Sequence, residues 1–116
     1  MHIDVAPVAE NVMRVTLAGR LDTPGVDRVE TQFIAALVPE AHNAVIDLSG
    51  VDFVASMGIR MLVSAARSLK LRRARLAVFG VQSTVRNVFD AVALDKILPI
   101  CATEADALAA VASGLE

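Results

Sequence analysis

The chain has 116 residues and a formal net charge of −2, with 55% hydrophobic residues, four Phe and no Trp or Tyr. This length predicts one domain covering residues 1–116, and the charge and the few aromatics argue against a nucleic-acid partner. No apolar run approaches the roughly 20 residues of a membrane span, no signal peptide is recognisable, and one cysteine cannot form an internal disulfide, so we expect a cytoplasmic protein without membrane insertion.

The chain begins with two predicted strands and a helix. The strands are expected at residues 2–6 and 12–17, and in the second an apolar face alternates with a polar one. The helix is expected at 24–37, with Thr23 as its N-cap and Pro24 at the first helical position. Its apolar face is predicted at Val26, Val29, Phe33, Ile34 and Leu37.

The middle of the chain predicts a buried strand followed by an amphipathic helix. Residues 44–48 are nearly all apolar, which is typical of a strand covered on both faces. A turn is expected at Ser49-Gly50, where Ser49 has only that local role. The helix is expected at 56–70. Its apolar stripe is predicted at Ile59, Leu62, Val63, Ala66 and Leu69.

Strands and helices continue to alternate to the end of the chain. The remaining elements are a strand at 75–79, a helix at 81–91, a strand at 97–100 and a helix at 103–112 with Thr103 as its N-cap. This order predicts an α/β fold: a mostly parallel five-stranded sheet with an antiparallel edge strand and four helices. The cations that follow residue 66 are interpreted as complements to a helix C-terminus. They are Arg67, Lys70, Arg72, Arg73 and Arg75.

Ser56 stands out because it lies at or beside the N-cap of the 56–70 helix. The N–H groups of the next three residues are expected to be unpaired, and with the helix dipole they favour a negative charge, such as a phosphate on Ser56. By helix physics alone, a structural cap is the simpler interpretation. A catalytic nucleophile would need a nearby base, and the sequence places neither His2 nor His42 close to it.

Other residues near Ser56 have two interpretations each. Gly58 is either a small residue in the first helical turn or a point of close approach for a partner. Met57, Arg60 and Met61 are predicted to form an exposed contact surface opposite the apolar stripe. No Cys/His cluster indicates a metal site, and no glycine-rich phosphate loop indicates a nucleotide cofactor, so no cofactor is expected.

The stretch Asp47-Leu48-Ser49-x-Val51-x-Phe53-x-x-Ser56-x-Gly58-Ile59 resembles the signature of the STAS domain, the fold of bacterial anti-sigma-factor antagonists. The resemblance extends to Gly-Arg-Leu-Asp at 19–22 and Arg-Asn-Val-Phe at 86–89. It implies a single STAS domain that acts in signal transduction and transcription regulation by partner switching, without enzymatic activity.

The resemblance places Ser56 at the family's phosphorylation position. It implies an anti-sigma-type serine kinase as partner, and a serine/threonine phosphatase that removes the phosphate. Asp22 matches an aspartate on the family's kinase-facing surface, although it is equally well explained as a charge at the start of a helix. Many switch members have an acidic residue where this chain has Ala55.

Two other kinds of function remain open from the sequence. The domain is alternatively an unphosphorylated STAS scaffold or a subunit of a transporter complex, with Ser56 as a cap. It is also compatible with a small-ligand-binding module, because α/β sheets bind ligands at the carboxyl ends of their strands.

Overall fold

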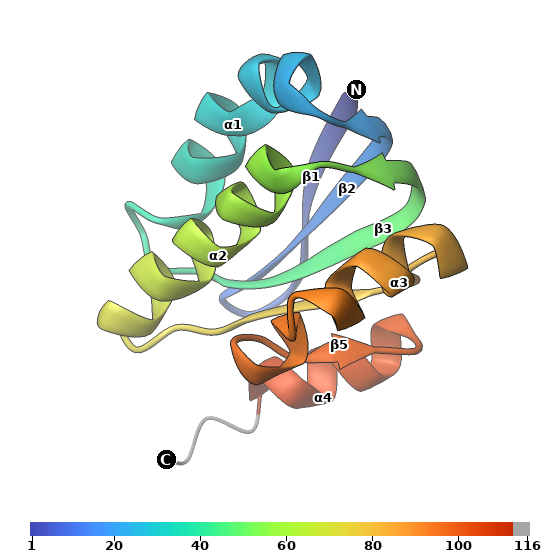
Figure 1. Cartoon of the computed structure of the whole chain (residues 1–116). Coiled ribbons are helices and arrows are strands. Elements are labelled where there is room, and N and C mark those ends of the chain that lie inside the picture. Colours follow the sequence, from blue (N-terminus) through green and yellow to red (C-terminus); the bar gives the residue numbers. More distant parts are fainter. Residues whose placement is uncertain (113–116) are drawn as a thin grey trace.

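The computed structural model describes residues 1–112, which form one five-stranded sheet in the order β1-β2-β3-β4-β5 (Figure 1). The β1–β2 pair is antiparallel and the other pairs are parallel, so the predicted sheet is confirmed. The elements are β1 (His2–Ala9), β2 (Val12–Leu21), α1 (Thr23–Leu37), β3 (Asn43–Val54), α2 (Ser56–Leu71), β4 (Leu76–Phe79), α3 (Ser83–Ala91), a 3₁₀ helix (Leu94–Lys96), β5 (Ile100–Cys101) and α4 (Glu104–Ala112).

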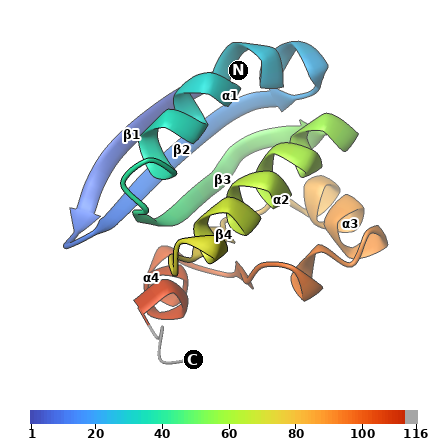
Figure 2. The ribbon, with the colours of Figure 1, turned by 90° about the vertical axis from the view of Figure 1, so that its left-hand side faces the viewer.

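Helices cover the sheet on both faces. The larger core cluster joins one face of the sheet to α1, α2 and α3, and includes the fully buried side chains of Phe33, Ile46, Leu62 and Phe89. A smaller cluster on the other face joins β3 and β4 to α4, which Figure 2 shows near the C-terminal end of α2. Each fully buried Leu, Ile or Phe contributes roughly 1.5–3 kcal/mol by leaving water.

β3 is longer than predicted and passes through the expected Ser49-Gly50 turn to Val54. Its register with β2 shifts twice, between the pairs Thr16↔Asp47 and Ala18↔Gly50, and again between Gly19↔Val51 and Arg20↔Phe53. β-Bulges of this kind add a residue to one strand and bend it without ending it. A Ser-Gly pair therefore marks an irregularity inside a strand here, which the sequence pattern alone does not distinguish from a turn.

The N-cap of α1 and several other element boundaries also differ from the prediction. The N-cap of α1 is Asp22 and not Thr23, because Oδ1 of Asp22 accepts the N–H of Gly25 at 2.9 Å. Thr103 is confirmed as the cap of α4, since its Oγ1 accepts the N–H of Asp106 at 3.1 Å. β1 and β2 run further than expected and α3 begins later. The strand predicted at 97–100 lies instead at β5 and shares only Ile100 with the prediction, because the 3₁₀ helix and a turn take up the preceding residues.

The buried face of α2 is rotated from the predicted stripe. Its buried residues are Gly58, Met61, Leu62, Ala65 and Leu69. Burial of Leu62 is confirmed, but Ile59 and Val63 are only half-buried, and the prediction that Met61 is exposed is wrong because its exposure is 0%.

Gly58 explains this rotation. A Cβ at Gly58 would lie 2.7 Å from both Cγ and the carbonyl oxygen of Leu21, so the first turn of α2 packs directly on the end of β2. With Gly58 facing β2, helical spacing carries Met61, Leu62 and Ala65 onto the same face.

Met61→Ala is therefore expected to lower the free energy of unfolding by about 2–5 kcal/mol, because it removes buried methylene groups and leaves a cavity. Arg60→Ala, on the exposed neighbouring residue, should change it by less than about 0.5 kcal/mol. Urea unfolding followed by circular dichroism measures both. Equal effects of the two substitutions would contradict the observed orientation of α2.

Candidate functional site

The candidate site lies where β2 and β3 end and the helices that follow them begin. Arg20 pairs with Phe53 and Leu21 with Val54 in the parallel register of the two strands. The N–H of Ala55 then donates to the carbonyl oxygen of Leu21 at 3.0 Å. The two chain segments are thus held together up to the start of α2, which places Asp22 and Ser56 at the same edge of the sheet.

Ser56 is exposed and is the first residue of α2, while Ala55 is the N-cap. No side chain caps the helix, so Ser56 lies beside the N-cap and does not serve as one. The prediction of three unpaired N–H groups is wrong for two of them. The N–H groups of Gly58 and Ile59 donate to the carbonyl oxygen of Ala55 at 2.9 and 3.2 Å.

The start of α2 nevertheless retains the features that favour an anion. Within residues 1–112, no acceptor is assigned to the N–H of Ser56 or of Met57. The first turn contains no acidic residue. The positive end of the helix dipole is therefore not offset by a side chain of the first turn, and a phosphate on Ser56 would meet unpaired donors.

Asp22 has the structural role that the sequence left open. Oδ1 accepts the N–H of Gly25, and Oδ2 accepts Nε of Arg20 at 3.3 Å. The pKa of the Asp22 carboxyl lies below its usual value, chiefly because the N–H of Gly25 donates to it and also because Arg20 is close. Desolvation of the carboxyl acts in the opposite direction but does not outweigh these effects. A stable negative charge therefore stands beside the loop that leads into Ser56.

Two neighbours of Asp22 went unrecognised in the sequence. Phe53 is 39% exposed, and the guanidinium of Arg20 lies 4.0 Å from the centre of its ring. Such a stack is a cation–π contact. Strand alternation would turn only one of two consecutive residues towards solvent, so it does not predict the exposure of Phe53. The bulge between Val51 and Phe53 exposes both Asp52 and Phe53.

The structure places the other predicted contact residues in different environments. Arg60 is exposed, and Met57 is half-buried against the core. Met61 faces the core, and Gly58 is buried against Leu21, so the structure corrects their assignment to a contact surface and gives the small size of Gly58 an internal reason.

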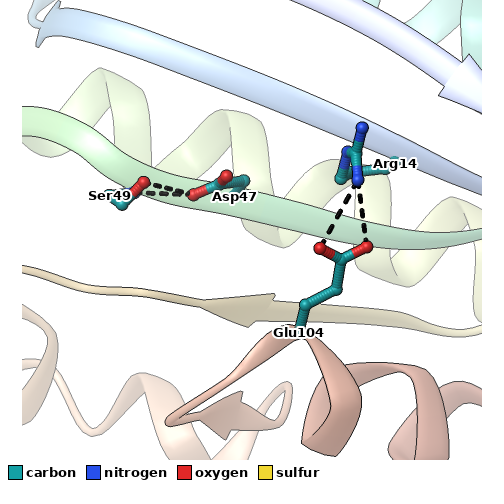
Figure 3. A network of polar contacts seen from close by, with 4 residues as sticks. All are labelled: Arg14, Asp47, Ser49 and Glu104. Carbon is teal, nitrogen blue, oxygen red and sulfur yellow. Dashed lines mark hydrogen bonds and ion pairs between the residues drawn. The ribbon is translucent and has the colours of Figure 1, made fainter.

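Ser49 contrasts with Ser56, because its hydroxyl is already engaged (Figure 3). Its Oγ donates to Oδ1 of Asp47 at 2.7 Å, and its N–H donates to the same oxygen at 2.9 Å. Figure 3 also shows Arg14 of β2 paired with Glu104 at the start of α4, with Nη1 3.1 Å from Oε2. The Arg14–Glu104 pair ties α4 to β2, whereas the Ser49 contacts are local to β3; within residues 1–112 the hydroxyl of Ser56 has no such hydrogen bond.

The chain matches the family described as the STAS domain over residues 5–107. It therefore belongs to the STAS domain family, and the observed sheet and helices have that fold. Within residues 1–112, no helix is both long and apolar enough to cross a membrane. The same residues contain no group of three or more His, Cys, Asp or Glu side chains arranged to hold a metal.

Known proteins similar to this chain include antagonists of anti-sigma factors. The anti-sigma-B factor antagonist of Listeria monocytogenes is 28% identical over 86 residues, or 74% of this chain and 75% of that protein. The crystal structure of an anti-sigma factor antagonist from Mycobacterium paratuberculosis is 28% identical, covers 96% of this chain and 93% of its own, and superposes with a TM-score of 0.81. The phosphorylated form of Bacillus SpoIIAA shares the fold at 19% identity and a TM-score of 0.66, over 93% of this chain and 97% of that one.

Proposed function

We propose that this protein is an anti-sigma-factor antagonist that binds an anti-sigma-type serine kinase while Ser56 is unphosphorylated and releases it after phosphorylation. It works by binding and carries out no chemistry of its own. A serine/threonine phosphatase restores the binding form. The similarity to anti-sigma factor antagonists supports the general role.

The observation that carries the switch is the exposed Ser56 hydroxyl at a helix N-terminus without a capping side chain. A kinase can reach this hydroxyl, and the unpaired N–H groups of Ser56 and Met57 can accommodate the phosphate. Within residues 1–112 no base is hydrogen-bonded to Ser56, which supports a modified residue over a catalytic nucleophile.

The binding surface surrounds Ser56. The sequence assigns Asp22, Met57 and Arg60 to this surface. We add Arg20 and Phe53, because both side chains are exposed at the same edge of the sheet. Arg and aromatic side chains are frequent binding hot spots because they combine a large contact area with directional contacts. Phosphorylation adds about −1.5 to −2 charges beside Asp22, so a partner fitted to a neutral serine meets repulsion and a cost of desolvation.

Displacement of a sigma factor tests this role. An anti-sigma-type serine kinase from the same organism is first bound to its sigma factor, and the unphosphorylated protein is then added. We expect a protein–kinase complex and free sigma factor in size-exclusion chromatography. If the protein neither binds such a kinase nor displaces its sigma factor, the proposal fails and a scaffold role remains.

A further inference from the structure

A groove lies at the opposite end of α2 from Ser56. It is formed by the C-terminal end of α2, the start of β4, the segment before β5 and the end of α4; in Figure 2, α2 ends close to α4. Its volume is about 940 Å³. A smaller hollow of about 220 Å³ adjoins it and shares Ala66, Lys70 and Ile97 with it.

Among residues 1–112, all the charged residues that line the groove and the hollow are cations. They are Arg67, Lys70, Arg73, Arg75 and Lys96, five of the 11 Lys and Arg in the chain. No ion pair within residues 1–112 engages the side chains of Arg67, Lys70, Arg73 or Lys96. The concentration is unusual in a chain whose net charge is −2.

The dipole of α2 explains only part of this cluster. Lys70 lies in the last turn of α2, where a cation complements the helix C-terminus. Arg67 lies a turn earlier, Arg75 precedes β4, and Lys96 comes from the 3₁₀ helix. Cations from separate elements thus converge on one groove, and within residues 1–112 no carboxylate is paired with Arg67, Lys70, Arg73 or Lys96, so their mutual repulsion favours an anion between them.

The floor between these cations is apolar. Leu76, Leu98 and Val111 line the groove and are nearly fully buried, while Ile97 lines both hollows and is 44% exposed. No aromatic side chain lines either hollow, so there is no platform on which a base would stack. The volume lies within the range of roughly 300–1,000 Å³ typical of small-molecule sites.

We propose that this groove binds a small amphiphilic anion, whose charged head pairs with Lys70 and Arg73 and whose apolar tail lies along Ile97 and Ala66, which line both hollows. The site is separate from the switch, because Lys70 lies 14 positions after Ser56, which corresponds to about 21 Å along the helix. Binding here does not depend on the proposed function, and Ser56→Ala should bind the anion as the wild type does.

Titration calorimetry with three probes tests the proposal: octyl phosphate below its micelle-forming concentration, octyl glucoside and inorganic phosphate. Octyl phosphate should bind, and the neutral tail or the anion alone should bind at least roughly tenfold more weakly. Lys70→Gln/Arg73→Gln should weaken octyl phosphate roughly tenfold or more. The control Arg28→Gln/Arg86→Gln removes the same charge from α1 and α3 and should have no effect.

Ile97→Ser tests the tail separately, and it should weaken octyl phosphate with only a small fall in the melting temperature, because Ile97 is already partly exposed. Three outcomes would overturn the proposal. They are equal binding of octyl glucoside and octyl phosphate, unchanged binding by Lys70→Gln/Arg73→Gln, and binding of a hexaglutamate peptide with none of octyl phosphate, which would indicate a peptide-docking surface instead.

Discussion

Ser56→Ala is expected to abolish phosphorylation by the cognate anti-sigma-type kinase completely. Wild-type protein incubated with this kinase and ATP should gain one phosphate, seen in the intact mass and located on Ser56 by peptide sequencing. The reason is access: Ser56 is exposed, and within residues 1–112 no hydrogen bond holds its hydroxyl.

Two serines serve as matched controls for this experiment. Ser49→Ala should still be phosphorylated normally, because the Ser49 hydroxyl is held by Asp47 at 2.7 Å. Ser64→Ala removes another exposed hydroxyl from α2, away from the helix N-terminus, and should also leave the reaction unchanged. A phosphate that persists on the Ser56→Ala protein would show that the acceptor has been assigned wrongly.

Phosphorylation of Ser56 is expected to weaken kinase binding by more than tenfold, or about 1.4 kcal/mol or more, while leaving the fold intact. At the start of α2 the added charge meets unpaired N–H groups, so folding should be unaffected or stabilised by about 0.3–1 kcal/mol at low salt. Titration calorimetry measures the affinity, and circular-dichroism melts measure stability.

Substitutions separate the charge from the hydroxyl. Ser56→Asp should lose part of the affinity, because it carries less charge and fewer acceptor oxygens than phosphoserine. Ser56→Ala should bind like the unphosphorylated wild type. Ser64→Asp adds the same charge farther along α2 and should bind normally. If Ser56→Asp unfolds the domain or binds as tightly as wild type, the electrostatic switch is wrong.

The sequence was most informative about the site where local backbone chemistry decides the outcome. The start of α2 follows from the change in hydrophobic period after Val54, and the confirmed cap at Thr103 follows from a side chain that bonds within its own helix turn. The cap of α1 was missed because Asp22 and Thr23 are adjacent and both can cap; the bond from Gly25 distinguishes them.

Apolar spacing and the alternation of strands and helices thus determined by themselves the order of elements, the mostly parallel sheet and the position of Ser56 at a helix start. Tertiary structure alone decided which side of α2 is buried and where Phe53 points. The apolar residues of α2 permit two adjacent stripes, and the close fit of Gly58 on Leu21 selects the one that contains Met61. Phe53 reaches solvent through a bulge, because strand register depends on pairing with β2, which is distant in sequence.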